Sequence, residues 1–251
     1  MCTLSFIPSN DEFLVGMNRD ELRTRTTALP PRTFDVDGTE AIFPRELGGG
    51  TWIASNDAGS LMALLNWHPA GRENSVEKPR TRGSIIPVLI SGRSPLEVTY
   101  RLRRLELKPV LPFRLICVFR ADAQVCEWKW DGCQLVRVEH PWARRHWFSS
   151  NISDARAAEA RLHAIEAASS PSSRLDETWL RDIHSSHLPS PGPFSICVHR
   201  EDATTVSYTV VRCSGTSISM GYLGGSPCER NGFDTVWTIA LRSGAAKGVS
   251  A

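Results

Sequence analysis

The chain starts with two short β-prone segments, residues 2–7 and 12–17, separated by the turn-forming sequence Pro-Ser-Asn-Asp. This pattern predicts a β-hairpin at the N-terminus. With a turn centred near Asn10, antiparallel pairing places residues whose numbers sum to about 20 opposite one another. Cys2 then lies beside Asn18 and Arg19. The hairpin would therefore bring a thiol and a polar sequence into one place.

Further short hydrophobic segments predict more antiparallel strands, with helices between them. Hairpins at both ends of a chain differ from the strict β-α-β alternation of a parallel sheet. We therefore expect an α+β fold, an αββα sandwich of antiparallel sheets, formed by a single domain over residues 1–251. Strands are expected at residues 51–55, 61–66, 114–120, 124–129, 134–138, 194–199, 205–213 and 217–222, and helices at residues 84–90, 95–105, 153–168 and 175–185.

The composition is typical of a folded protein. Of the 251 residues, 41% are hydrophobic and 22% are charged, and the net charge of +2 comes from interspersed signs. No basic run predicts binding to nucleic acid or to an anionic membrane. No segment reaches the ~20 apolar residues of a spanning helix, and the N-terminus lacks a signal-peptide pattern. We expect a cytoplasmic protein without stable membrane insertion, and the composition leaves its oligomeric state open.

The cysteine and histidine spacings do not match those of common metal sites. The seven cysteines are odd in number and none forms a Cys-x-x-Cys pair, so reduced thiols are the simplest interpretation. His184 and His187 have the spacing of a helical ligand pair, but no third ligand accompanies them. The sequence therefore predicts no structural metal.

Cys2 is the strongest candidate for a reactive group. A small residue after Met1 permits removal of the methionine, which leaves a thiol beside a free α-amine. An α-amine titrates near ~7.7–8.0 and a thiol near ~8.5, so proton transfer between them costs little at neutral pH. The alternative is an inert cysteine buried in a strand.

The sequence Asn18-Arg19-Asp20-Glu21 follows the second strand of the expected hairpin. A guanidinium close to a thiol favours the thiolate, and a carboxylate can anchor a new α-ammonium. The alternative is a solvated turn with a surface ion pair. The expected hairpin register favours the first interpretation because it places the four residues beside Cys2.

Four further residues are candidates for the same site. Asn66 ends an apolar strand. Its amide either donates a hydrogen bond to an oxyanion or only marks the end of the strand and the start of the following loop. Trp67 follows it and lines either a pocket or the core. Asn151 precedes an expected helix, where its alternative role is an N-cap. His199 is either a general acid or a hydrogen-bonded structural residue.

The order of several motifs resembles that of the NRDE family, whose eukaryotic members are called transport and Golgi organisation protein 2. The resemblance covers most of the chain and is densest in residues 1–85. The motifs that carry it are Met1-Cys2, Asn18-Arg19-Asp20-Glu21, Gly49-Gly50-Thr51-Trp52, Leu65-Asn66-Trp67, Thr81-Arg82-Gly83 and Ser150-Asn151.

The family in turn resembles the cysteine branch of the N-terminal-nucleophile hydrolases, which includes penicillin V acylase and bile salt hydrolase. This resemblance implies that Cys2 is the nucleophile, Asn66 the oxyanion amide and Asn151 a second structural amide. Arg19 and Asp20 match an arginine and an aspartate that these hydrolases place three residues apart. Arg19 and Asp20 are adjacent in this sequence, so only one of them is expected to superpose on its counterpart in these hydrolases. Residues expected to bind substrate are Asn18, Trp67, Arg82 and His199.

Two functions are consistent with these residues. In the first, the protein is an N-terminal-nucleophile hydrolase that cleaves non-peptide C–N amide bonds through an acyl group on Cys2. In the second, it is a non-catalytic carrier whose pocket holds haem or an acyl-chain or lipid ligand. Neither function requires a resident cofactor, because haem would be a carried ligand. Fold similarity alone does not choose between them.

Overall fold

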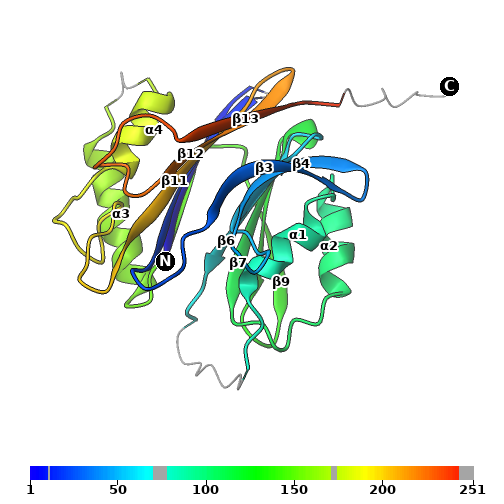
Figure 1. Cartoon of the computed structure of the whole chain (residues 1–251), viewed down its shortest axis with the longest axis horizontal. Helices are drawn as coiled ribbons and strands as arrows, with labels where there is room; N and C mark the ends of the chain where they lie inside the picture. Colours follow the sequence, from blue (N-terminus) through cyan, green and yellow to red (C-terminus); the bar gives the residue numbers. More distant parts are fainter. Residues whose placement is uncertain (11, 70–77, 171–173, 243–251) are drawn as a thin grey trace.

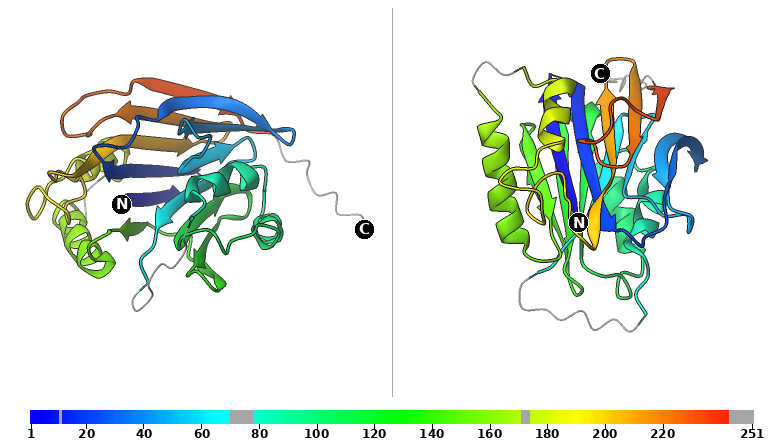
Figure 2. Two further views of the ribbon diagram at one scale, coloured as in Figure 1. Left: turned by 60° about the horizontal axis from the view of Figure 1, so that its bottom comes forward. Right: turned by 60° about the vertical axis from the view of Figure 1, so that its left-hand side comes forward.

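The computed structural model describes residues 1–10, 12–69, 78–170 and 174–242. In this part of the chain, two antiparallel sheets stack face to face (Figures 1 and 2). The first sheet has the strand order β10-β1-β2-β11-β12-β13, and the second runs from β3 to β9 in sequence order. The first sheet comprises β1 (Cys2–Ser9), β2 (Glu12–Leu22), β10 (Arg145–Ser149), β11 (Ala203–Cys213), β12 (Ser217–Gly224) and β13 (Thr235–Ala240).

Helices cover the outer face of each sheet. Helices α3 (Asp154–Ala167) and α4 (Glu177–His184) lie on the first sheet, and α1 (Ile85–Leu89) and α2 (Pro95–Arg103) lie on the second (Figure 1). This arrangement confirms the expected αββα sandwich. The second sheet comprises β3 (Leu29–Val36), β4 (Thr39–Arg45), β5 (Ile53–Asn56), β6 (Ser60–Asn66), β7 (Phe113–Phe119), β8 (Gln124–Trp130) and β9 (Leu135–His140), with short 3-10 turns η1 (Arg82–Ser84) and η2 (Arg120–Asp122).

The main hydrophobic cluster lies between the two sheets. Strand alternation sends Leu4 and Phe6 of β1 into it, whereas the intervening Thr3 and Ser5 face the helices. Strand β6 contributes Leu61, Ala63 and Leu65 from the other sheet. Because both sheets supply this cluster, neither sheet buries its inner face without the other.

The N-terminal hairpin forms as the turn sequence predicts. Cys2 pairs with Arg19 of β2, within one residue of the expected register, and with Ser149 of β10 on its other side. Strand β11 continues the sheet beyond β2. Cys2 therefore starts an inner strand, with neighbours on both sides.

The strand expected at residues 194–199 is wrong. This segment makes only an isolated bridge, between His199 and Thr204. Side chains take two of its carbonyls instead: Arg161 Nε donates to Ser195 O, and Asn18 Nδ2 donates to Ile196 O. These two carbonyls are therefore satisfied without a neighbouring strand, whereas Val198 O accepts from Thr205 N of β11. Four strands, β3, β4, β10 and β13, are present beyond those expected.

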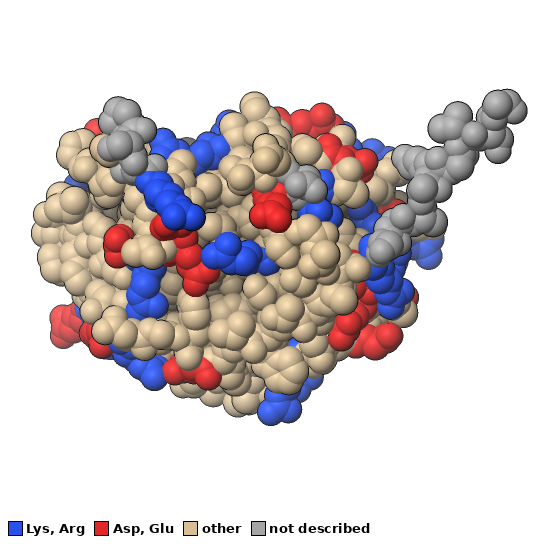
Figure 3. Space-filling model, turned by 90° about the horizontal axis from the view of Figure 1, so that it is seen from above, with Lys and Arg blue, Asp and Glu red and all other residues tan. Residues whose placement is uncertain are grey.

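Three further properties concern the helices, the thiols and the surface charge. Within the described ranges no helix has the length and apolar character needed to cross a membrane. The seven cysteines are free thiols. On the face shown in Figure 3, charged side chains of both signs are interspersed.

Candidate active site

A cavity of about 340 Å³ opens where the N-terminus lies between the two sheets (Figure 1). Strands β1 and β2 form one wall, and the end of β6 and the turn η1 form the other. We call it the Cys2 cavity. It is lined by Met1, Cys2, Arg19, Glu21, Arg25, Glu46, Thr51, Trp52, Leu64, Asn66, Pro79, Arg80, Thr81, Arg82, Gly83 and Leu111.

Cys2 is buried in the wall of this cavity, with 7% of its surface exposed. Met1 precedes it and exchanges two backbone hydrogen bonds with Asp20, each of 3.0 Å. Burial raises the pKa of the Cys2 thiol, although the Met1 ammonium and, more weakly, Arg19 act in the opposite direction. With Met1 in place, the thiol is therefore neutral at pH 7.

Strand alternation splits the sequence Asn18-Arg19-Asp20-Glu21 between two faces of the first sheet. Arg19 and Glu21 face the Cys2 cavity. Arg19 Nη2 lies 2.6 Å from Glu46 Oε1 and 3.3 Å from Glu21 Oε1, and the guanidinium stacks on Trp52 at 4.3 Å. The guanidinium is thus held by two carboxylates and a ring, so its position beside Cys2 is fixed.

Asp20 points away from the cavity, towards α3. Its Oδ1 accepts a hydrogen bond of 2.7 Å from Thr205 Oγ1. Its Oδ2 is buried without a hydrogen-bond donor among the described residues and lies 3.8 Å from Arg161 Nη2. A free carboxylate oxygen at this depth has room for one more donor, and the Asp20 charge is close enough to raise the pKa of Cys2.

Arg161 of α3 joins the same buried cluster and was not a sequence candidate. The residue is fully buried. Its Nη1 donates to Cys2 O at 3.3 Å, Thr3 Oγ1 at 3.0 Å and Ser149 O at 3.3 Å. The sequence could have indicated its burial, because Arg161 follows Ala157 by four residues and so lies on the face of α3 that packs against the sheet. Arg161 therefore fixes the start of β1 from behind.

Asn18 links the hairpin to the helical layer and lies outside the cavity. Its Nδ2 donates to His184 O at 2.8 Å and to Ile196 O at 3.0 Å. Its Oδ1 lies 3.0 Å from His184 Nδ1, and His184 Nε2 lies 2.9 Å from Ser5 Oγ. Burial lowers the pKa of His184 to about 3, so the ring is neutral at physiological pH. Asn18 is thus placed as a structural junction.

Replacing His184 is expected to weaken the acid sensitivity of the fold. A base whose pKa is lowered on folding binds protons more tightly in the unfolded chain. The free energy of unfolding therefore falls as pH drops below about 6.5, by about 1.4 kcal/mol per pH unit, until about pH 3. Between pH 6.5 and 5, we expect His184→Gln to lose about 2 kcal/mol less than the parent protein, as measured by urea unfolding.

The matched control for this measurement is His163→Gln, because His163 lies on the exposed side of α3. It should show the same pH dependence as the parent protein. If His184→Gln also shows that dependence, His184 is not the group whose protonation destabilises the fold.

Asn66 and Arg82 reach the cavity from the second sheet. Asn66 is the last residue of β6. Arg82 is placed by a close backbone approach, because a Cβ on Gly50 would lie 3.0 Å from the Gly83 carbonyl carbon. Arg82 Nη1 donates to Pro112 O at 3.1 Å. Burial lowers the pKa of Arg82, and the nearby Cys2 opposes this effect.

Three further candidates are not among the residues that line the cavity. Asn151 is exposed, and its Oδ1 accepts from Arg200 Nη1 at 3.1 Å. Trp67 lies under Lys129 Nζ at 5.8 Å. His199 belongs to a separate histidine and cysteine cluster. The structure therefore gathers Cys2, Arg19, Asn66 and Arg82 at the cavity and places the other candidates around it.

Glu46 is a second residue that sequence reasoning missed. Its Oε1 accepts from Arg19 at 2.6 Å and from Arg25 at 2.9 Å. Glu46 follows β4, a strand absent from the sequence expectations. Nothing local in the sequence indicated that it would meet Arg19, because the contact depends on how the two sheets stack.

The fold is that of the N-terminal-nucleophile hydrolases. The structure is similar to that of the C2A mutant of conjugated bile acid hydrolase from Clostridium perfringens, with a TM-score of 0.52 and 12% identity over 96% of this chain and 92% of that chain. The structure of penicillin V acylase from Agrobacterium tumefaciens aligns with a TM-score of 0.49 and 10% identity, over 97% of this chain and 92% of that chain.

The sequence profile of the Transport and Golgi organisation 2 family matches residues 1–166. The chain therefore belongs to this family, which confirms the resemblance carried by the motifs near the N-terminus. A search of curated protein sequences finds no match.

Proposed function

We propose that the protein is an N-terminal-nucleophile hydrolase that cleaves a non-peptide C–N amide bond after removal of Met1. The observation that carries this proposal is the convergence of Cys2, Arg19, Asn66 and Arg82 on one cavity at the start of an inner strand. A cavity of about 340 Å³ is of the size that takes a small molecule. The reduced thiols suit a cytoplasmic location, which is part of the proposal.

Removal of Met1 would supply the base. Met1 and Asp20 exchange both backbone hydrogen bonds, so the backbone groups of Cys2 point to the other neighbouring strand, where Ser149 is the partner. The new α-amine would lie at the end of β1, the strand that pairs with β10 on one side and β2 on the other. Asp20 Oδ2 lacks a hydrogen-bond donor among the described residues and is the acceptor proposed for the ammonium form of this amine, beside the ion pair with Arg161 at 3.8 Å. The same step deletes the methionine that lines the cavity, and so opens the thiol to a substrate.

The proposed reaction has two steps. The Cys2 sulfur bonds to the amide carbonyl carbon, and its proton passes through the α-amine to the leaving nitrogen as the C–N bond breaks. Water then attacks the resulting thioester, which releases a carboxylic acid and restores the thiol. Asn66, on the opposite wall, is the side-chain donor proposed for the oxyanion that forms in each step.

The charges of the cavity favour a substrate with an anionic group. Arg19 and Arg25 already share Glu46. Arg82 forms no ion pair with a carboxylate among the described residues, although it lines the cavity. A half-buried cation that no carboxylate of the described residues pairs with is available to a carboxylate or similar group on the ligand. We therefore propose that the substrate is a small acyl amide that carries a negative charge.

Processing of the N-terminus is the first test. Intact mass distinguishes the chain with Met1 from the chain that starts at Cys2, and alkylation followed by peptide mapping reports on each thiol. Because burial raises the pKa of Cys2 while Met1 is present, we expect Cys2 to be alkylated at least ~10-fold faster at pH 7 once it is the first residue. The exposed Cys133 is the internal control.

The two forms should also differ towards substrates. In a screen of small anionic amides, an acyl adduct on Cys2, seen as a mass increase, is expected only for the processed chain. Equal alkylation rates of Cys2 with and without Met1 would show that the free α-amine does not activate the thiol. Ligand retention without any adduct would instead favour a carrier of haem or of an acyl-chain or lipid ligand.

A further inference from the structure

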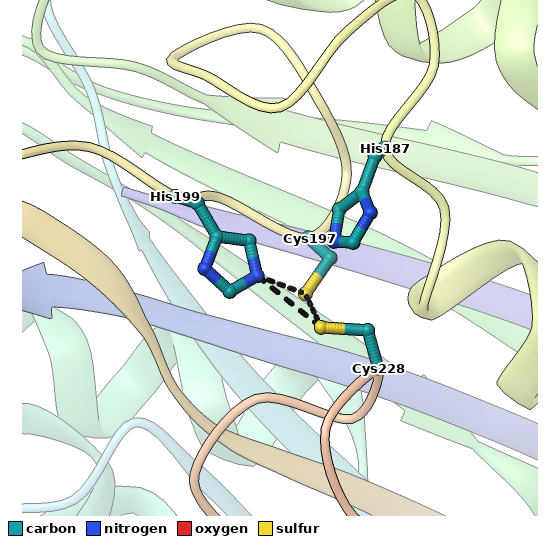
Figure 4. A group of neighbouring side chains, drawn as sticks. All are labelled: His187, Cys197, His199 and Cys228. Atoms are coloured by element: carbon teal, nitrogen blue, oxygen red, sulfur yellow. Dashed lines mark hydrogen bonds between the residues drawn. The ribbon is translucent and has the colours of Figure 1, made fainter.

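A second cluster of reactive side chains lies outside the Cys2 cavity. His187, Cys197, His199 and Cys228 point towards one another (Figure 4). They come from three segments: the loop after α4, the segment before β11 and the loop between β12 and β13. Hydrogen bonds that do not involve the four side chains hold these segments in place. Cys197 N donates to Ser186 O at 3.0 Å, and Ser226 Oγ donates to Thr205 O at 2.9 Å.

The spacing of the four side chains matches a tetrahedral coordination shell. Their potential ligand atoms all lie within 4.8 Å of one another. Cys197 Sγ is 3.5 Å from Cys228 Sγ and 3.6 Å from His199 Nε2, and His199 Nε2 is 3.2 Å from Cys228 Sγ. Zinc bonds of about 2.3 Å to sulfur and about 2.0 Å to nitrogen separate two sulfurs by about 3.8 Å and a sulfur from a nitrogen by about 3.5 Å.

The two histidines supply independent observations that point to a ligand. His187 Nε2 is buried and has no hydrogen-bond partner among the described residues, which is costly for a ring nitrogen unless another atom occupies the site. His199 presents Nε2 to the sulfurs, while its Nδ1 lies 3.9 Å from Glu229 Oε1. A carboxylate behind the ring is the usual way in which a metal-binding histidine is oriented.

We propose that His187, Cys197, His199 and Cys228 form a structural zinc site of the Cys2His2 type. Four protein ligands close the coordination shell, so the ion has no open position for a substrate. Binding converts the two thiols to thiolates and releases their two protons, which leaves a site with no net charge. This proposal revises the expectation from the sequence that the protein contains no structural metal.

The site would stabilise the layer that supports the active-site hairpin. The loop that carries His187 begins after His184, and the segment that carries Cys197 includes Ile196. Both His184 O and Ile196 O accept hydrogen bonds from Asn18. An ion that joins these segments to the loop of Cys228 therefore holds the acceptors of Asn18 in place, on the side of β2 opposite the cavity.

The spacing explains why the sequence alone did not reveal this cluster. Common zinc motifs place ligands in short pairs such as Cys-x₂-Cys. Here Cys197 and His199 are separated by one residue, while His187 lies 10 residues before Cys197 and Cys228 lies 29 residues after His199. Only the packing of three loops brings them together.

The test measures metal content and metal binding of the full-length protein. The protein purified without chelator is expected to hold about one zinc ion per chain by elemental analysis. After removal by chelator under reducing conditions, added Co²⁺ should produce the thiolate charge-transfer absorption of a tetrahedral sulfur-containing site. Added Zn²⁺ should displace the cobalt and raise the thermal unfolding midpoint by several degrees, because an ion that binds only the folded state stabilises it.

Two variants and one control make the result specific. Cys228→Ser and His187→Ala each remove one ligand at a partly exposed position, and each should lower zinc content and abolish the cobalt absorption while the circular dichroism of the fold remains. Cys133→Ser removes an exposed cysteine outside the cluster and should keep both signals. If one of the two ligand variants does not fold, the other is used to measure whether zinc still raises the thermal unfolding midpoint.

Several outcomes would overturn the proposal. Zinc content far below one per chain with no cobalt absorption would do so, as would equal metal binding in Cys228→Ser and Cys133→Ser. A disulfide between Cys197 and Cys228 in the protein freshly purified without reductant would assign the pair to redox chemistry instead. None of these outcomes depends on Cys2, so the experiments test the zinc site independently of the proposed hydrolase activity.

Discussion

Cys2→Ala is expected to lower amide turnover by at least about 10³-fold in the processed protein, because it deletes the atom that forms the covalent bond. The fold should survive. The side chain is small and sits at the start of a strand, so its removal costs about 1 kcal/mol of unfolding free energy. The measurement is turnover of an amide found in the adduct screen, with urea unfolding of the same preparation.

Cys2→Ser tests the chemistry of the thiol separately from its packing, because serine has nearly the same size as cysteine. A hydroxyl is far less ionised than a thiol at neutral pH, so only a trace of turnover should remain. Cys133→Ser makes the same chemical change at an exposed site and should retain full turnover. Unchanged turnover in Cys2→Ala would rule out Cys2 as the nucleophile. A carrier would instead lose tenfold or less in ligand affinity in this variant.

The parts of the fold that the sequence predicted are those whose signals are local. A turn sequence between two β-prone segments predicts the hairpin, and its register follows from the turn to within one residue. The strands expected at residues 51–55 and 61–66 pair as β5 and β6, and the helix expected from residue 153 forms as α3, whose Ser153 N-cap accepts a hydrogen bond from Arg156 N. The predicted neighbours of Cys2 lie in this local part of the structure.

The parts that the sequence did not predict depend on contacts between distant segments. Register and alternation together decide that Arg19 faces the cavity while the adjacent Asp20 faces α3. Glu46 meets Arg19 only because two sheets stack, and the histidine and cysteine cluster needs three loops. The segment at residues 194–199 has the composition of a strand, but side chains from β2 and α3 take its carbonyls.

Arg161 shows most clearly how a distant contact controls the site, and its replacement is expected to have the largest effect on stability. Arg161→Met removes the donors to Cys2 O, Ser149 O and Ser195 O, all of them buried. It also leaves the Asp20 carboxylate without its cation. Breaking a buried charged pair in this way costs about 3–5 kcal/mol of unfolding free energy. Urea unfolding at neutral pH measures the loss.

The matched control is Arg103→Met, because Arg103 is exposed near the end of α2 and should change stability by no more than about 0.5 kcal/mol. Asp20→Asn tests the source of the loss. If the unpaired carboxylate is the main cost, the double variant Arg161→Met and Asp20→Asn should be more stable than the sum of the single variants predicts. Strict additivity would show that Arg161 acts through the carbonyls alone. In that case Asp20 stays free to bind the α-ammonium of Cys2, and Arg161 holds the first residues of β1 in place by hydrogen bonds rather than by charge.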